Sequence, residues 1–415
     1  MKFNKNTMGW MMYDFANSAF TTIIVTVVYN RYFVEKVVGD NSLGIALWGR
    51  AIALSMIIVA LTTPIMGAIA DYSRSKKKFL FINSYICVIF TALLFFVREG
   101  NVFTGMLFFI LASVGYHSAN VFYNSFLPEI ASEEDIGKVS GMGWALGYVG
   151  GLISLLLALI LVNNRLTIWV FPMVALFFLV FSGFSLVWMK EFSRPSKRSN
   201  YFKIAYHRIA ESARNIKKFK QLVRYLISYF IYNDGITTVI AFTSIYGMER
   251  FGLSVKDVIK LFIYAQFTSI GGAWLFGYLA DKMNLKVTIN ISLIIWIVVV
   301  ILAFLSRTSQ EFFYIVLLAG VAIGSSQANS RTLLSNLTPR GKQAEFFGFY
   351  SIAGRISSIV GPLLFGEVKR ITGDIRYSIL SVLVFFIAGF IMLLTVRIDE
   401  GIKFAKTWKG EADTV

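Results

Sequence analysis

Four charged side chains lie inside strongly apolar stretches of this sequence, and their chemistry is the natural starting point. They are Asp14, Asp234, Arg331 and Arg355. A charged group in the hydrocarbon core of a membrane is costly, so such residues usually face the bundle interior and bind one another, an ion or a substrate. Two carboxylates and two guanidinium groups balance in charge. This balance suggests the hypothesis of a zwitterionic solute, with its carboxylate on an arginine and its ammonium on an aspartate.

Other polar residues accompany each aspartate at helical spacing, which places them on one face of an otherwise apolar helix. Two interpretations are open for these faces. They line a cavity in which a carboxylate binds a cation, a proton or an ammonium group, or the carboxylates only hydrogen-bond neighbouring helices and fix their packing. The two sets are Asp14, Asn17 and Thr21, and Asn233, Asp234 and Thr237.

Arg331 follows Gln327 by four residues, so the two side chains share a helix face. Arginine stays charged, and its planar group matches the geometry of a carboxylate or a phosphate. We therefore expect Arg331 or Arg355 to hold an anionic group of a solute. The alternative is a buried ion pair with one of the aspartates or with Glu345 that sets the conformation of the protein.

His117, Asn120 and Asn124 share one face of a further apolar stretch. A histidine in this position could relay protons, because its pKa lies near physiological pH. A lone histidine is more often a hydrogen-bonded packing residue, and this second interpretation stays open. The two asparagines are expected to line a cavity rather than to take part in proton transfer.

The sequence offers little for metal, nucleotide or enzymatic chemistry. The single cysteine, Cys87, excludes an internal disulfide and a cysteine-built metal site, and two histidines leave little material for a histidine-ligated metal. No phosphate-binding loop of the Walker type is present, and no histidine accompanies a nucleophile at a recognisable spacing. We therefore expect no cofactor, no metal and no enzymatic activity.

The elements that must position these residues are long apolar segments. Hydrophobic residues make up 56% of the 415 residues and charged residues only 15%, whereas soluble domains are about one quarter charged. A helix needs about 20 mainly apolar residues to cross a membrane. Twelve such segments predict an all-α integral membrane protein with twelve transmembrane helices, near 9–33, 45–70, 78–97, 102–127, 141–162, 167–189, 222–247, 257–280, 287–306, 312–335, 345–368 and 376–397.

The chain is strongly basic, with 40 Lys and Arg against 23 Asp and Glu and a formal charge of +17. Such an excess can indicate a nucleic-acid partner. However, 26 of these 40 bases fall in the segments on one side of the predicted membrane, and basic loops mark the cytoplasmic side. We therefore expect both termini and the linker 191–221 in the cytoplasm, and a lipid bilayer rather than a nucleic acid as the partner.

Several landmarks recur at about half the chain length. This duplication predicts two pseudo-symmetric six-helix halves, residues 1–190 and 222–415, as in transporters whose halves rock about a central site. The recurring residues, at offsets of 210 and 211, are Gly67 and Asp71 with Gly277 and Asp281, and Pro128, Gly143 and Gly150 with Pro339, Gly354 and Gly361.

Several motifs resemble those of a known superfamily. GAIADYSRSKKKF at 67–79 resembles the loop between the second and third spans of the major facilitator superfamily, and GYLADKMNLK at 277–286 is similar to it. YDFANSAF (13–20), YNSFLPEIA (123–131), GKVSGMGWALGYVGG (137–151), YNDG (232–235) and SQANSR (326–331) resemble the vacuole-effluxer branch of this superfamily, in its bacterial form. The resemblance covers essentially the whole chain and implies the major facilitator fold.

The resemblance implies a secondary-active transporter that moves a small polar solute by alternating access. Fungal members of this branch export amino acids, so amino-acid efflux, coupled to a proton or sodium gradient, is the leading expectation. The alternatives are a lipid or lysolipid flippase and a transporter of sugars, organic anions or drugs. We expect a monomer in the bacterial cytoplasmic membrane.

The resemblance also implies a gate at the cytoplasmic helix ends, where ion pairs form in one state and separate in the other. Asn284 stands where the second copy would match Arg74. Glu129 is expected to pair with an Arg or Lys of a neighbouring loop, whereas Lys77 and Lys78 are expected only to mark the cytoplasmic side. The gating candidates are Gly67, Asp71, Arg74, Glu129, Asp281 and Glu345.

Overall fold

The computed structural model describes residues 5–73, 75–130, 136–190, 219–282, 284–338, 346, 350, 354 and 358–408. Every regular element among these residues is helical, which confirms the prediction of an all-α protein. Residues 191–218 of the predicted linker 191–221 lie outside the described residues, and so do Arg74, Glu345 and Arg355.

The elements before the linker comprise α-helices, two π-helices and two short 3₁₀ turns. They are α1 (Lys5–Ala19), the π-helix η1 (Phe20–Val27), α2 (Tyr29–Arg31), the π-helix η2 (Tyr32–Val38), α3 (Asn41–Ser73), α4 (Lys76–Leu93), η3 (Leu94–Phe96), α5 (Val102–Ile130), α6 (Ile136–Asn163), η4 (Thr167–Trp169) and α7 (Val170–Trp188). After the linker follow α9 (Lys220–Phe251), α10 (Val255–Lys282), α11 (Leu285–Leu305), α12 (Ser309–Leu337), α14 (Val360–Thr372), α15 (Ile375–Ser381), α16 (Leu383–Leu394) and α17 (Ile398–Thr407).

Ten stretches of helix among the described residues are long and apolar enough to cross a membrane. Each coincides with one of the twelve predicted segments. The predicted segment 222–247 lies within the 32-residue helix α9, which is too polar to qualify by composition alone. Most of the segment 345–368 lies outside the described residues. The count of twelve therefore stays a prediction.

The chain forms two compact units. The first contains the described residues of Met1–Ala205, Ile240–Ile263 and Pro362–Ser378, and the second contains those of Tyr206–Val239, Tyr264–Gly361 and Ile379–Val415. The chain passes from one unit to the other within the helices α9, α10 and α14, so each of these helices has residues in both units. The halves predicted from the sequence, 1–190 and 222–415, divide the chain only at the linker.

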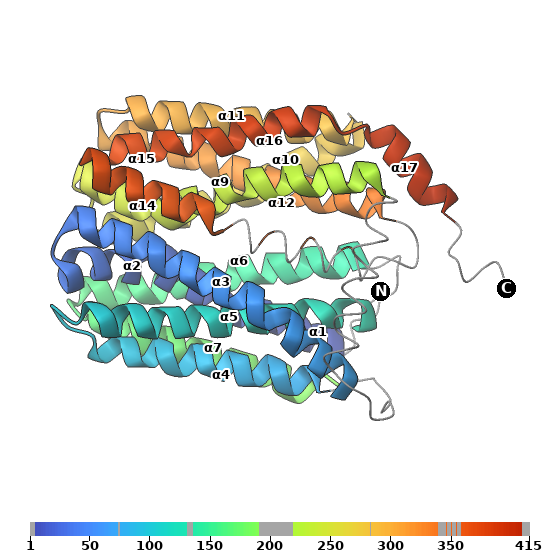
Figure 1. Ribbon diagram of the computed structural model, residues 1–415. Coiled ribbons are helices and arrows are strands. Elements are labelled where there is room, and N and C mark those ends of the chain that lie inside the picture. The colour runs from blue at the N-terminus through green and yellow to red at the C-terminus, as the bar shows by residue number, and fades with distance from the viewer. Residues whose placement is uncertain are drawn as a thin grey trace. The chain divides into compact units, whose positions relative to one another are not determined.

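In the first unit, α4 packs against α5 and α7, while α1 packs against α6 and α7. The helices α3, α4, α5 and α7 run side by side in Figure 1. Four glycines with a positive φ stand at one end of this unit, among them Gly252 after α9 and Gly373 after α14. Only glycine adopts this conformation without strain, and it ends helices for that reason. We call this the turn end of the first unit.

In the second unit, α11 packs against α12 and α16. Local signals define where these helices begin. Asn284 caps α11 by accepting from the backbone N–H of Lys286 at 2.8 Å. Thr308 accepts from the N–H of Glu311 at 3.2 Å, and the Glu311 carboxylate accepts from the N–H of Arg307 at 2.8 Å. This reciprocal arrangement is the capping box that fixes a helix start.

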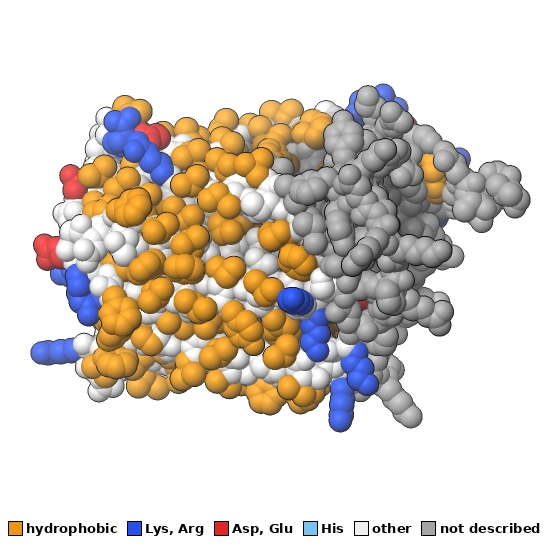
Figure 2. Space-filling view, turned by 60° about the horizontal axis from the view of Figure 1, so that its bottom comes forward, with side chains coloured by type: hydrophobic (Ala, Val, Ile, Leu, Met, Phe, Trp, Pro, Cys, Tyr) orange, Lys and Arg blue, Asp and Glu red, His pale blue; other side chains and the backbone are white. Residues whose placement is uncertain are grey.

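The outer surfaces of the helices are apolar. Val187 and Trp274 are each 76% exposed, as expected for side chains that contact lipid rather than water. On the face shown in Figure 2, apolar side chains cover the middle of the helices, whereas charged side chains lie toward the helix ends.

Lys77 and Lys286 occupy equivalent places in the two halves. Lys77, at the start of α4, donates to the carbonyl of Met189 after α7 at 2.7 Å. Lys286, at the start of α11, donates to the carbonyls of Leu394 and Val396 after α16 at 2.8 and 2.7 Å. Carbonyls at a helix C-terminus lack intrahelical donors and carry partial negative charge, which an ammonium group offsets. The expectation that Lys77 only marks the cytoplasmic side is therefore wrong.

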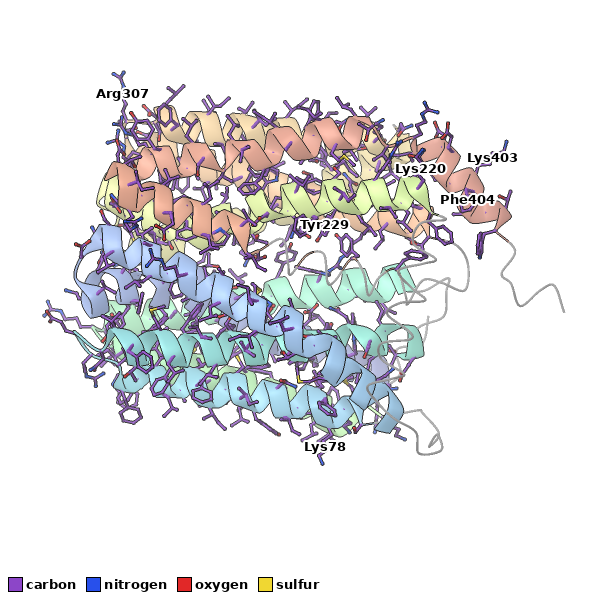
Figure 3. All side chains as sticks on the ribbon, in the orientation of Figure 1. Lys78, Lys220, Tyr229, Arg307, Lys403 and Phe404 are labelled. Carbon is purple, nitrogen blue, oxygen red and sulfur yellow. The ribbon has the colours of Figure 1, made fainter. Side chains whose placement is uncertain are left out.

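Lys77→Met should lower the free energy of unfolding by about 1 kcal/mol, because it removes a charged hydrogen bond at a partly exposed helix end. Lys78→Met is the matched control, since Lys78 is exposed and points away from the neighbouring helices in Figure 3. Thermal unfolding of the purified protein in detergent measures both. Equal melting temperatures for the two variants would contradict this role of Lys77.

Candidate functional site

The polar residues predicted on the first span meet those of α5 inside the first unit. Asn17 is buried, and its amide donates to the Asn120 side chain at 3.3 Å. Asn120 in turn donates to the backbone carbonyl of Tyr116 at 3.1 Å. Thr21 and Asn120 both lie within hydrogen-bond reach of the Tyr116 hydroxyl, and Asp14 is close enough to interact with it electrostatically. We call Asp14, Asn17, Thr21, Tyr116 and Asn120 the first polar cluster.

The Asp14 carboxylate lies against a glycine ridge of α6. A Cβ atom at Gly143 would lie 3.3 Å from Oδ2 of Asp14 and 2.7 Å from the Trp10 ring. A Cβ atom at Gly147 would lie 3.0 Å from the Ser18 hydroxyl and 3.6 Å from the Asp14 carboxyl carbon. Asp14 is half-buried rather than sealed in the core. The glycines therefore make the room in which this carboxylate sits.

His117 and Asn124 are less central than Asn120. His117 is half-buried and packs edge-on against Tyr116, with ring centroids 4.9 Å apart. Asn124 is exposed. The structure thus brings Asn120 into the first polar cluster, whereas it places Asn124 one turn away on an accessible surface. A proton relay through His117 stays a prediction.

In the second unit, Asp234 is 1% exposed and has backbone partners. Its Oδ1 accepts from the N–H of Gly361 at 2.9 Å, and the N–H of Val360 is a second donor to the carboxylate. Asn233 donates to the carbonyl of Gly354 at 3.4 Å, and Ser358 donates to the Thr237 hydroxyl at 3.2 Å. The polar face predicted on α9 is therefore real, and it packs against the described residues that precede α14 and begin it.

Arg331 lies in a cluster of tyrosines. It is close enough to Tyr229 and Tyr350 to interact electrostatically with both hydroxyls, and these two rings stack at 4.0 Å. The backbone carbonyl of the neighbouring Ser330 accepts from the Tyr225 hydroxyl at 2.6 Å. The Ser330 hydroxyl forms a second hydrogen bond, also of 2.6 Å, with the Tyr232 hydroxyl. The helix α9, with Tyr229 labelled in Figure 3, supplies three of these rings.

The glycine contacts identify the residue of the second unit that corresponds to Asp14. Gly143 meets Trp10 and Asp14, and its equivalent Gly354 meets Tyr229 and Asn233. Trp10 and Tyr229 are 219 residues apart, as are Asp14 and Asn233. The neutral Asn233 therefore takes the place of Asp14 in the second unit, and Asp234 takes that of Phe15.

Among the gating candidates, Glu129 forms the expected ion pair. Its carboxylate accepts from the Lys76 ammonium at 2.7 Å, between the end of α5 and the start of α4. The side chains of Gly67, Asp71 and Asp281 lie outside the described part of the structure, together with Arg74 and Glu345. Within the described residues, no group of three or more His, Cys, Asp or Glu is placed to hold a metal ion.

The sequence reading missed a buried polar contact at the turn end. Asn30 is fully buried, and its amide donates to Ser244 of α9 at 2.6 Å and to the carbonyl of Thr26 at 2.8 Å. Ser244 also donates to the Thr26 carbonyl. That carbonyl is available because η1 is a π-helix, whose wider turns alter the backbone pairing. Asn30 itself could have been found as an amide in an apolar segment, but the π-helix could not.

Close packing completes the contact at this end of the first unit. A Cβ atom at Gly49 would lie 2.3 Å from the carbonyl oxygen of Pro362, and Phe242 stacks on Phe365 at 4.2 Å. Arg50 donates to Glu367 at 2.5 and 2.8 Å. The ends of α9 and α14 thus pack tightly against α3 and the second half of the first span.

Long apolar helices with buried polar clusters define an integral membrane protein with a polar interior. The chain is similar in fold to a crystal structure of a mutant of the nucleoside transporter NupG, with a TM-score of 0.73, 14% identity, and coverage of 94% of this chain and 99% of that one. It is also similar to the D-xylose-proton symporter, with a TM-score of 0.72, 14% identity, and coverage of 94% and 96%. At this identity the likeness establishes the fold alone.

The model of the family described as vacuole effluxer Atg22 like matches residues 32–406, and the chain belongs to this family. It is 29% identical to the uncharacterized MFS-type transporter YxiO of Bacillus subtilis (strain 168) over 410 residues, which cover 95% of each chain. It is 25% identical to autophagy-related protein 22 of Kluyveromyces lactis over 394 residues, 85% of this chain and 80% of that protein. The YxiO match agrees with a bacterial-type member.

Asn30→Ala should lower the free energy of unfolding by about 1–3 kcal/mol, because it removes the hydrogen bonds that the buried amide makes to Ser244 and to the Thr26 carbonyl. Asn164→Ala is the control, since Asn164 bonds only within its own helix end, to Ile160, and is exposed. Thermal unfolding compares the two variants. Alkylation of a Ser244→Cys reporter should also be faster with Asn30→Ala than without it, and an unchanged rate would contradict a holding role for Asn30.

Proposed function

We propose that this protein is a secondary-active transporter that exports amino acids or closely related small zwitterions by alternating access, driven by a proton or sodium gradient. The family and the fold support transport by a major facilitator. The family is described as vacuole effluxer Atg22 like, and autophagy-related protein 22 is among the relatives of this chain. The solute class, the direction of transport and the coupling ion are proposed here.

The observation that carries the proposal is the setting of Asp14. This carboxylate is half-buried within a membrane span and belongs to a cluster of neutral polar groups from α1, η1 and α5. A carboxylate together with neutral amides and hydroxyls offers oxygen atoms that can bind a cation or an ammonium group. Asp234, in contrast, is buried and accepts hydrogen bonds from backbone N–H groups. We therefore assign the solute ammonium or the coupling ion to Asp14.

A zwitterion also requires a positive group for its carboxylate. Arg331, which is half-buried on α12, is the described candidate for this group. The tyrosine hydroxyls near this guanidinium are neutral at physiological pH and can donate to the same anionic group. Gln327, one turn earlier and also half-buried, offers an amide on the same face.

The protein is further proposed to reside in the bacterial cytoplasmic membrane with both termini in the cytoplasm. The distribution of Lys and Arg along the sequence supports this orientation. Arginine and lysine in short loops resist translocation, so the side that carries most of them stays inside.

A flux screen in proteoliposomes tests the function and the role of Asp14 together. Amino acids, sugars, organic anions and lysolipids are each supplied under an imposed proton or sodium gradient, and gradient-driven flux is expected for amino acids. Asp14→Asn should reduce this flux at least about tenfold, the equivalent of ~1.4 kcal/mol, because the neutral amide cannot hold a cation. Flux of lysolipid but not of amino acids would overturn the proposed solute class.

Arg331→Ala should raise the concentration of amino acid needed for half-maximal flux at least about tenfold, since the carboxylate loses its charged partner. Arg331→Lys should recover only part of this loss, because the ammonium lacks the planar fork. Arg307→Ala is the control: Arg307 is exposed and points outward in Figure 3. Normal amino-acid transport by Arg331→Ala would exclude the assigned role.

A further inference from the structure

Asp234 is a buried carboxylate within a membrane span whose partners are backbone groups. The two N–H groups that donate to it belong to Gly361 and Val360, the first residues of α14. The first N–H groups of a helix have no acceptor within the helix, and a carboxylate placed there satisfies them and offsets the positive end of the helix dipole. Asp234 therefore acts on α14 as a capping residue contributed by a different helix.

The residues on both sides fit this contact closely. A Cβ atom at Gly361 would lie 2.6 Å from Oδ1 of Asp234 and 2.0 Å from the Thr238 hydroxyl, so any larger residue would displace the carboxylate. Thr238 is fully buried and donates to the backbone carbonyl of Asp234 at 2.6 Å. The contact is thus built from a carboxylate, a glycine and a hydroxyl that all depend on close approach of α9 and α14.

The first unit shows what happens without the carboxylate. Gly150 of α6 is the equivalent of Gly361, and a Cβ atom there would lie 2.1 Å from the backbone oxygen of Phe15. Phe15 occupies the place of Asp234, and its ring packs on Phe177 and Phe181 of α7 instead. The helix α6 continues through this level from Ile136 to Asn163, so it has no free N–H groups to cap. A carboxylate is present where a helix begins and absent where the helix is continuous.

The contact lies close to two places where the chain passes from one compact unit to the other. The chain passes between the two compact units after Val239 in α9 and after Gly361 in α14. Asp234 and Gly361 lie within one or two turns of these two crossing points. The hydrogen bonds of Asp234 hold the start of α14 on α9 close to both crossing points.

We propose that Asp234 is a positioning residue of the transport cycle: it holds the start of α14 on α9, and it binds neither the solute nor the coupling ion. The inference goes beyond the assignment of solute and ion to Asp14 and Arg331. It also gives Asp234 a role that an uncharged acceptor of the same size can fill. Asparagine keeps an oxygen in the place of Oδ1, whereas leucine has no acceptor.

Hydrogen exchange of the full-length protein in nanodiscs tests this directly, whether or not a solute is known. In Asp234→Leu the amides of Val360 and Gly361 should exchange about five- to tenfold faster than in the wild type, the range expected for loss of a helix cap. Asp234→Asn should stay within about twofold of the wild type. Amides of α6 around Gly150 serve as the internal control and should not change.

Unchanged exchange in Asp234→Leu, or equally fast exchange in Asp234→Asn, would overturn the capping role. Should Asp234→Leu fail to fold, Gly361→Ala gives the same test, because its methyl group displaces the carboxylate; it should also accelerate exchange at Val360.

Flux then separates this inference from the proposed function. If Asp234 is a positioning residue, Asp234→Asn retains gradient-driven flux with the wild-type dependence on pH and sodium, whereas Asp234→Leu loses it. Loss of flux or of ion dependence in Asp234→Asn with normal exchange would assign the carboxylate to solute or ion and overturn the inference. Absence of flux for every solute in the wild type would overturn the proposed function only, since the exchange result stands independently.

Discussion

The close contact of backbones across glycines is the interaction on which the rest of the structure depends. In the first unit α1 approaches α6 at Gly143, Gly147 and Gly150, and in the second unit α9 meets Gly354 and Gly361 in the same register. Lipid surrounding a helix is as apolar as a helix surface, so helices associate through close packing and polar contacts rather than through the hydrophobic effect. Because glycine has no side chain, these positions leave room for the polar side chains of Asp14, Asn233 and Asp234.

These same contacts separate the two intramembrane carboxylates into different roles. Asp14 lies beside a continuous helix, whose backbone N–H groups are paired within that helix, and it belongs to a cluster of neutral polar side chains. Asp234 lies at the start of α14 and satisfies N–H groups that would otherwise be unpaired. The local state of the neighbouring backbone, rather than the type of side chain, decides what each carboxylate can do.

Much of the fold was predictable because it follows from composition and spacing. Apolar length predicted helical spans, and ten of them are present among the described residues. The facing of Asn17 and Asn120, and the pairing of Glu129, involved residues that the sequence marks as polar in apolar surroundings. The Asn30 contact and the Lys77 cap were missed, because each depends on a partner from a distant segment, Ser244 of α9 for Asn30 and the Met189 carbonyl for Lys77.

The sequence by itself determined that the chain is helical and membrane-embedded and that a few charges lie within its apolar segments, because each of these follows from the hydrophobic cost of exposing or burying a given residue type. Only the tertiary structure decided the partners. It made Asn233 the counterpart of Asp14 in the glycine contacts, since the offset between α1 and α9 is 219 residues and that between their glycine partners is 211. Hydrogen bonds depend on positions within a few tenths of an ångström, and sequence spacing alone does not specify the register between separate helices.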